Sequence, residues 1–201
     1  MTSTTRDTGK GAQTRHAILT AAIARFGRDG YRATSVADIA RDAGVGGTVA
    51  YAYFPNKEAL FLAAVDEDAA GVIERGVTTV LGDASLADWR RSLIFTLVAA
   101  VEHHPLARRL LAGLEPDVTE RVLEIPAITE LRKACADRLR SEQVAGSVRA
   151  DIDPVVVANG VVAIVLSLLM SVVQVGGNAA ATYADDVAAV FAAALDPPRA
   201  T

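Results

Sequence analysis

The sequence predicts an all-α protein in which a small N-terminal helical domain precedes a larger helical one. Three observations carry this prediction. Apolar residues recur every three or four positions in one segment after another, which is the period of amphipathic helices. No segment alternates apolar and polar residues as a half-buried strand does. Alanine is abundant throughout, and it favours helices that pack closely.

The first predicted helix begins at Thr14, after a Thr/Ser/Gly-rich segment over residues 1–13 that we expect to be a flexible arm. Its apolar residues share one stripe: Ile18, Leu19, Ala22, Ile23 and Phe26. The segment from Gly27 to Gly30 is expected to end this helix.

A short second helix is predicted from Val36 to Ala43, where apolar residues again keep helical spacing. Ser35 and Asp38 have the spacing of a capping box at its start. Gly44 ends the helix, because glycine readily takes the positive φ that follows many helices.

A third helix is predicted from about Gly46 to Tyr53. Pro55 ends it, since proline disfavours the helical conformation in the residue before it. Asn56 then caps a long fourth helix that continues to about Val80.

The remaining chain also has helical periodicity, in segments separated by Pro, Gly or Asp. The predicted helices are Ser85–His103, Leu106–Leu114, Asp117–Gln143, Pro154–Val175 and Tyr183–Leu195. Pro126 lies inside the third of these and is expected to kink or split it.

The segment Val155–Val175 is long and apolar enough to cross a bilayer. Asn159, Ser167 and Gln174 interrupt it, however, and no Lys/Arg cluster flanks it. We therefore expect a helix buried in the protein or between subunits, with no stable membrane association. Membrane contact stays open as the alternative.

Composition and charge limit the class of protein. Half of the 201 residues are hydrophobic (51%) and 22% are charged, which is typical of a globular chain. A single cysteine, Cys135, excludes an internal disulfide framework and a cysteine-rich zinc site. The N-terminal residues lack the apolar core of a secretory signal. Residues 1–60 carry eight basic and five acidic groups, whereas the rest is acidic, so the two parts are expected to meet different partners.

Two short helices joined by the tight turn Ala43-Gly44-Val45, with a helix on either side, form a helix-turn-helix arrangement. The run continues with Tyr51-Ala52-Tyr53-Phe54-Pro55-Asn56-Lys57-Glu58 into the fourth helix. From Ile18 to Leu60 the sequence resembles the DNA-binding domain of the TetR family, the tetracycline-repressor-like bacterial regulators. The resemblance implies a DNA-binding domain over residues 14–62 and a helical effector-binding and dimerisation domain over residues 63–201.

The resemblance also implies roles for individual residues. Gly46–Ala52 would be the recognition helix, with Thr48 and Ala52 at the bases and the phenols of Tyr51 and Tyr53 at phosphates. The expected DNA-binding residues are Thr34, Ser35, Gly46, Gly47, Thr48, Tyr51, Ala52, Tyr53 and Lys57. The sequence departs from the family pattern at Gly46 and Gly47, where Ser and a basic residue are common, so base contacts are few.

In the second domain no individual residue is carried over from the family, and the candidates come from the helical pattern. Candidates for an aliphatic effector pocket are Trp89, Leu93, Phe95, Leu97, Leu110, Leu114, Ile128, Leu131 and Cys135. Candidates for a dimer interface are Asn159, Leu166, Met170, Val187, Val190 and Phe191. The pair His103-His104 is expected to interact with a helix dipole.

These observations favour a cytoplasmic, homodimeric regulator that binds a double-stranded operator and associates with the nucleoid when DNA-bound. A small apolar or amphipathic effector would release it, and we expect no cofactor and no metal. One alternative is a helical ligand- or partner-binding module whose DNA binding is weak or lost. A hydrolytic enzyme using Cys135 and a histidine is a weaker alternative, because the sequence contains no recognisable catalytic motif.

Overall fold

The computed structural model describes residues 4–82, 89–115, 125–176 and 178–197, and every regular element within these ranges is a helix. In chain order the elements are α1 (Thr4–Ala33), α2 (Val36–Asp42), α3 (Gly47–Tyr53), α4 (Lys57–Leu81), α5 (Trp89–Val101), α6 (Pro105–Leu111), α7 (Pro126–Val144), α8 (Pro154–Val175) and α9 (Asn178–Leu195). The predicted all-α class is confirmed.

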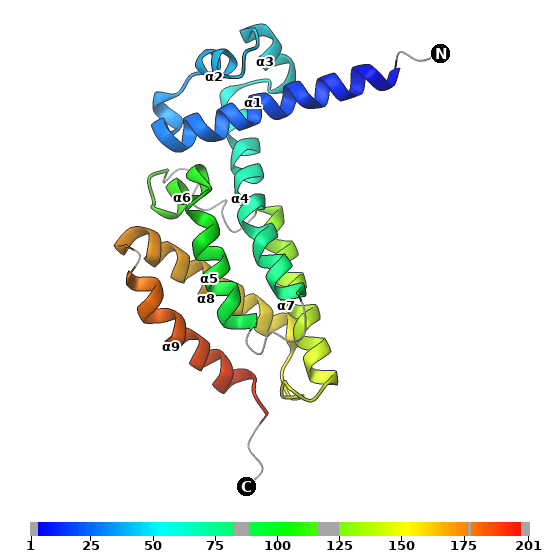
Figure 1. Ribbon diagram of the computed structural model, residues 1–201, viewed down its shortest axis with the longest axis vertical. Coiled ribbons are helices and arrows are strands. Elements are labelled where there is room, and N and C mark those ends of the chain that lie inside the picture. The colour runs from blue at the N-terminus through cyan, green and yellow to red at the C-terminus, as the bar shows by residue number, and fades with distance from the viewer. Residues whose placement is uncertain (1–3, 83–88, 116–124, 177, 198–201) are drawn as a thin grey trace.

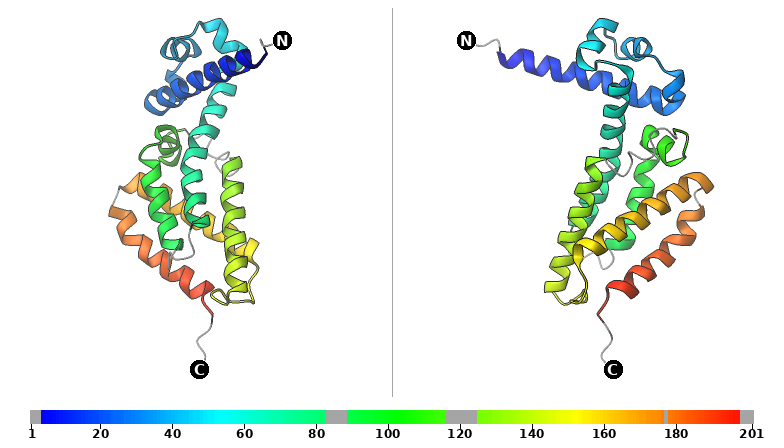
Figure 2. Two further views of the ribbon diagram at one scale, coloured as in Figure 1. Left: turned by 45° about the vertical axis from the view of Figure 1, so that its right-hand side comes forward. Right: turned by 180° about the vertical axis from the view of Figure 1, so that it is seen from behind.

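The helices form a head and a body that are joined by α4 (Figure 1). The head contains α1, α2 and α3, and α1 lies across the upper end of α4. From there α4 runs down into the body, where it packs against α5, α6 and α7. The two further views show α8 crossing the body obliquely, with α9 on its outer side (Figure 2).

The core is continuous from head to body because α4 contributes to both. Leu60 and Phe61, near the start of α4, are buried in the head, whereas Val72, Ile73 and Val80 are buried in the body. A fully buried side chain of this size stabilises the fold by ~1.5–3 kcal/mol. The head is therefore attached by apolar packing as well as by the chain itself.

Helix α1 differs from its prediction at both ends. It begins at Thr4, so most of the expected arm is helical, because each residue added to an existing helix gains a hydrogen bond at small entropic cost. The helix also continues as far as Ala33. The helical backbone conformation is nevertheless interrupted at Gly30, whose φ of 84° and ψ of 168° are non-helical.

The later helices begin and end at residues that differ slightly from the predicted ones, and local sequence signals explain the differences. Of the kink or split expected at Pro126, the structure shows that α7 begins at this residue, since proline fits the first helical turn where no amide donor is needed. Helix α6 ends at Leu111, before Gly113 with its φ of 72°. The parts of two predicted helices at 85–88 and 117–124 lie outside the described residues.

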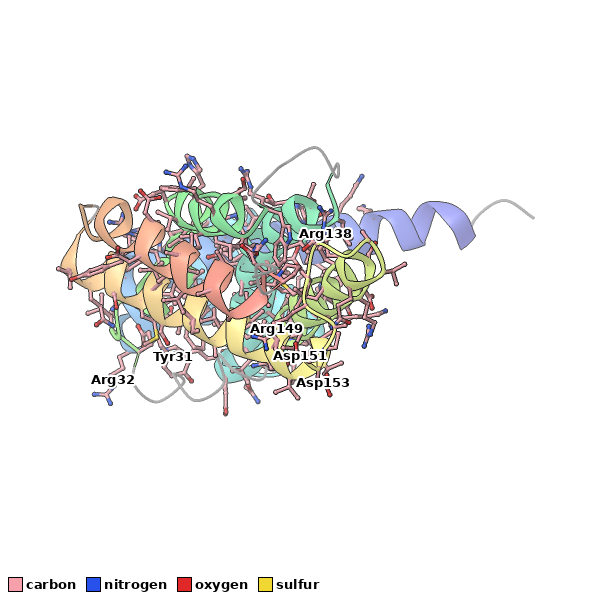
Figure 3. The ribbon with its side chains drawn as sticks, turned by 90° about the horizontal axis from the view of Figure 1, so that it is seen from below. Tyr31, Arg32, Arg138, Arg149, Asp151 and Asp153 are labelled. Atoms are coloured by element: carbon pink, nitrogen blue, oxygen red, sulfur yellow. The ribbon has the colours of Figure 1, made fainter. Side chains whose placement is uncertain are left out.

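Polar groups fix the turn between α7 and α8 at the lower end of the body. Asp153 caps α8 by accepting hydrogen bonds from the amides of Val155 (2.8 Å) and Val156 (3.3 Å). The Arg149 guanidinium pairs with Asp151 at 2.6 Å. The view from below shows Arg149, Asp151 and Asp153 gathered at the beginning of α8, away from Tyr31 and Arg32 (Figure 3).

Among the described helices, α8 has the length and the apolar composition needed to cross a membrane. It packs, however, against α5, α6, α7 and α9. Val161, Val162, Val165 and Leu169 are buried in this packing. The apolar side chains on one side of α8 are thus buried within the body.

Candidate nucleic-acid interface and body cavity

The turn between α2 and α3 is built by local hydrogen bonds. The Ser35 hydroxyl caps α2 by accepting from the Asp38 amide at 3.1 Å. At the other end the amides of Gly44 and Val45 donate to the carbonyls of Arg41 and Ala40, at 3.1 and 2.9 Å. This is a Schellman arrangement, which needs a positive φ at the residue after the helix, and Gly44 has a φ of 67°. The turn therefore sets the angle between α2 and α3.

Few side chains of α3 are buried against the rest of the head. Ala50 is fully buried, and Phe54, just after the helix, is also in the core. Thr48, Val49 and Ala52 are exposed, and 52% of Tyr51 is accessible to solvent. Small side chains keep the helix slim, so it can enter a groove ~12 Å wide.

The start of α4 lies beside the end of α1. Asn56 caps α4 through its side-chain oxygen, which accepts from the Ala59 amide at 2.7 Å. The ammonium of Lys57 lies 4.4 Å from the centre of the Tyr31 ring and donates to the Arg32 carbonyl at 3.5 Å. Lys57 is therefore half-buried and oriented rather than free in solvent.

An ion pair braces α1 against α2. Arg25 donates to both carboxylate oxygens of Asp42, at 2.6 and 3.1 Å. Hydrogen bonding to this guanidinium lowers the pKa of the Asp42 carboxyl below its ordinary value of 3.8. Asp42 thus stays charged and paired at neutral pH.

The structure corrects the role expected of Thr34. Its side chain is 3% exposed and its hydroxyl donates to the Gly30 carbonyl at 2.8 Å. That hydroxyl closes the end of α1 and is not presented to a phosphate. Ser35 is exposed at the start of α2, but its hydroxyl donates to Asp38 Oδ2 at 2.6 Å and so is also engaged within the fold.

The N-terminal part of α1 runs beside the end of α3, a feature the sequence analysis did not predict. A Cβ on Gly11 would lie 3.5 Å from the Tyr53 hydroxyl, and Lys10 on the same turn is exposed. The available signal was the absence of proline between Thr4 and Thr14, which allows the helix to extend.

A small cavity of ≈ 40 Å³ lies in the body between α4, α5, α6, α7 and α8. Its lining is entirely apolar: Ala69, Val72, Ile73, Val101, Ala107, Leu110, Leu111, Ile125, Ile128, Leu166 and Leu169. Two residues predicted for a pocket, Leu110 and Ile128, belong to this lining.

The other predicted pocket residues lie elsewhere. Trp89, Leu93, Leu97, Leu131 and Cys135 are buried outside the cavity lining, and Phe95 and Leu114 are 39% and 57% exposed. Periodicity identified an apolar side chain in each case, but the neighbouring helices decide whether it faces a cavity, the core or solvent.

The residues suggested for catalysis or sensing are engaged in the fold. Cys135 is fully buried, and burial raises the pKa of its thiol to about 12, so the reactive thiolate is absent at neutral pH. The amides of His103 and His104 donate to the carbonyls of Ala100 and Val101 at the end of α5, at 3.0 and 3.1 Å, whereas the His104 imidazole faces α4. Its Nδ1 lies 2.9 Å from Asp68 Oδ1, while Asp68 Oδ2 accepts from the amides of Leu106 and Ala107 at the start of α6.

One face of α8 and α9 exposes small and aliphatic side chains. These include Val156, Gly160, Ala163, Ile164, Ser167, Ala189, Val190 and Ala193. Of the predicted interface residues, Asn159 and Val190 lie exposed, and Met170 and Val187 are partly buried. Leu166 and Phe191 point inward instead, at 8% and 3% exposure, and Leu166 lines the cavity.

Comparison with protein families matches residues 18–64 to the model of bacterial regulatory proteins of the tetR family. These residues span α2, α3, the main part of α1 and the beginning of α4. The comparison with curated proteins found no match.

Solved structures share the architecture of the whole chain. A TetR transcriptional regulator from Chloroflexus aurantiacus is 23% identical with a TM-score of 0.71, over 94% of this chain and 99% of that one. A gamma-butyrolactone receptor described as ArpA-like is 25% identical with a TM-score of 0.60, covering 94% and 90%. The TetR family protein CprB from S. coelicolor is 24% identical with a TM-score of 0.62, covering 92% and 90%. The fold is thus that of TetR-family regulators.

Proposed function

We propose that this chain, whose residues 18–64 belong to the tetR family of bacterial regulatory proteins, is a ligand-responsive transcriptional repressor. It binds a near-palindromic operator as a homodimer and releases it when a small effector enters the body. The observation that carries this proposal is the exposed helix α3, held at a fixed angle by the Ser35 cap and the Gly44 turn.

The geometry supports insertion of α3 into the major groove. Thr48 and Ala52 lie on the exposed part of the helix, where a hydroxyl and a methyl can meet base edges. Tyr51 and Tyr53 on the same helix and Lys57 at the start of α4 can contact phosphates, as can the amides of Gly46 and Gly47. Phosphate contacts position the protein, whereas base contacts give specificity.

The exposed face of α8 and α9 supports a homodimer. Its small side chains allow two helices of each copy to pack closely, and an apolar surface of this kind is unfavourable in water. A two-fold dimer would present two α3 helices to successive major grooves, about 34 Å apart along the DNA. We therefore assign residues 63–201 to effector binding and dimerisation.

The apolar lining of the body cavity supports an effector whose inserted part is uncharged and aliphatic, since burial of an unpaired charge there is costly. A cavity of ≈ 40 Å³ holds little more than one water molecule. Entry of an effector must therefore move the surrounding helices. Operator and effector would then weaken each other's binding by the same factor. One structural neighbour is itself a gamma-butyrolactone receptor.

A second candidate is a helical ligand-binding module with weak DNA binding. Two observations favour it: α3 carries no charged side chain, and Gly46 caps the helix without a side-chain hydrogen bond. Both candidates place the protein in the bacterial cytoplasm, and the first adds association with the nucleoid.

Selection of genomic fragments by the purified protein, followed by fluorescence anisotropy, separates the two candidates. The repressor is expected to enrich a near-palindromic fragment and to bind it more tightly than a scrambled duplex by a factor of about 10³ or more at physiological salt. Enrichment of no fragment, with only salt-sensitive binding common to all duplexes, would leave the ligand-binding module.

A further inference from the structure

The outward side of α3 consists of short side chains that are rich in methyl groups. Successive residues of a helix are rotated by about 100°, so Thr48 and Ala52 lie about 40° apart, with Val49 beside them. Ala50 points the opposite way. The burial agrees with this geometry, because Ala50 is fully buried whereas the other three side chains are exposed. A groove that receives α3 therefore meets one hydroxyl and several methyl groups.

The side chains that usually read bases through hydrogen bonds are missing from α3. Arginine and lysine pair with guanine, asparagine and glutamine with adenine, and aspartate and glutamate with cytosine. The helix, Gly47–Tyr53, contains none of these residue types. The Thr48 hydroxyl at the centre of the outward side can both donate and accept, so it discriminates little between bases.

Polar side chains on either side of α3 in the sequence are engaged within the head. The side-chain oxygen of Asn56 caps α4, and this oxygen is one of the two atoms with which an asparagine pairs with adenine. Arg41 pairs with Asp38 on α2, and the Lys57 ammonium lies over the Tyr31 ring. Base readout by these side chains would require them to leave their partners.

Two glycines leave the beginning of α3 open. A Cβ on Gly47 would have no other described atom within 4 Å, and one on Gly46 would meet only Cγ2 of Val49, at 3.9 Å. Val49 is 42% exposed. The methyl groups of Val49 are thus uncovered on the side of the helix start, where a base edge can lie against them.

Thymine is the base that matches such a surface. In the major groove it presents a methyl group at C5, in addition to one hydrogen-bond acceptor. Packing of this methyl against those of Val49, Ala52 or Thr48 removes apolar surface from water on both partners. Short side chains also allow the helix backbone to approach the base edges, because apolar carbons are in contact at ~4 Å.

From these observations we propose that α3 selects its operator through the 5-methyl groups of thymine, with Val49 as a specificity-determining residue beside Thr48 and Ala52. The inference rests on the proposed function, since it needs α3 in the major groove, and residues 18–64 belong to a family of regulatory proteins. The operator then carries thymine at neighbouring positions of each half-site, where a methyl group and not a hydrogen-bonding edge decides the base.

The first test replaces thymine by uracil, which lacks only the 5-methyl group and keeps every hydrogen-bonding atom. The full chain first selects its preferred duplex from a random pool. Each thymine of one half-site is then replaced in turn by deoxyuridine, and affinity is measured by fluorescence anisotropy. At the contacted positions we expect a loss of about fourfold, which corresponds to one buried methyl group, and no change at the other thymines.

The converse test returns the methyl group to a different base. Replacing a contacted thymine by cytosine is expected to lower the affinity, because the methyl group is lost and the exposed acceptor becomes a donor. 5-Methylcytosine at the same position is expected to recover about fourfold of that loss, since it restores the methyl group alone.

Val49→Ala tests the assignment to Val49. Because alanine has a smaller apolar surface, exchange of thymine for uracil at the Val49 position is expected to cost this variant about twofold or less, instead of about fourfold. Val144→Ala is the matched control, since Val144 is an exposed valine at the end of α7 in the body, and it is expected to keep the fourfold loss. The uracil series on the natural chain does not depend on the folding of any variant.

The outcomes separate this inference from the proposed function. A selected operator on which every exchange of thymine for uracil is neutral would overturn the inference and leave the regulator intact. A uracil effect that is equally large in Val49→Ala and in the natural chain would overturn the role of Val49. Selection of no preferred duplex would refute the proposed function and the inference with it.

Discussion

At the residue scale, the head depends on a few side chains that satisfy backbone groups or charges. Ser35 and Asn56 cap two helices, and Thr34 closes the end of α1. Capping side chains contribute ~1 kcal/mol each. Residues that resemble phosphate ligands in sequence can thus be structural, as the buried Thr34 hydroxyl is, and exposure decides between the two roles.

The Arg25–Asp42 pair gives the head a dependence on pH. The pKa of Asp42 is lowered in the folded state, so the carboxylate stabilises the fold above its ordinary pKa of 3.8 and loses this effect as the pH falls through the lowered value. We expect the free energy of unfolding of Asp42→Asn to lie below that of the natural chain at pH 7, with the gap closing below pH 3.8.

Urea denaturation between pH 7 and pH 2 measures this gap. Glu130→Gln, which alters an exposed carboxylate on α7, serves as the control. A gap that stays constant across this range would show that Asp42 stabilises the head without its charge.

At the scale of elements, a glycine within α4 allows this helix to pack closely against His104, which precedes α6. Gly71 lies in the middle of α4, where glycine costs ~1 kcal/mol relative to alanine. The His104 imidazole lies against this position, and a Cβ there would overlap its Cε1 atom. The pairing of His104 with Asp68 prevents the ring from moving aside easily.

A double-mutant cycle tests this contact between α4 and His104. Gly71→Ala alone is expected to lower the free energy of unfolding, since overpacking costs ~1–3 kcal/mol and exceeds the gain in helix propensity. In the His104→Ala background the same change should instead stabilise the protein by about 1 kcal/mol. Equal effects in both backgrounds, measured by thermal or urea unfolding, would contradict the packing described here.

At the scale of the whole molecule, α4 joins a head with an exposed α3 to a body with an exposed α8–α9 face. We expect Ile164→Arg to convert the proposed dimer to a monomer, because it places a charge in the centre of that face. Val144→Arg is the matched control, since Val144 is 91% exposed at the end of α7, outside the α8–α9 face. Sedimentation velocity separates the outcomes, and a monomeric natural chain would refute the dimer.

The parts of the molecule that could be predicted from the sequence are those that local signals determine. Ser35, Gly44 and Asn56 act on residues within four positions, so the α2–α3 turn and the start of α4 lie where expected. The cavity depends on how five helices meet, and periodicity cannot say which of Phe95, Leu97 or Leu110 faces it. Contacts such as Tyr31 with Glu115 join distant segments and leave no periodic signal.

The most direct test of DNA binding by the head is the salt dependence of affinity for a duplex, compared between Lys57→Ala and Lys133→Ala. Lys57 lies beside α3, whereas Lys133 is exposed on α7 in the body. Each phosphate contact that is lost lowers the slope of log affinity against log salt by about one. We predict this loss for Lys57→Ala and an unchanged slope for Lys133→Ala. Equal slopes for both variants and the natural chain, or binding that does not depend on salt, would contradict a DNA-binding surface formed by α3 and the start of α4.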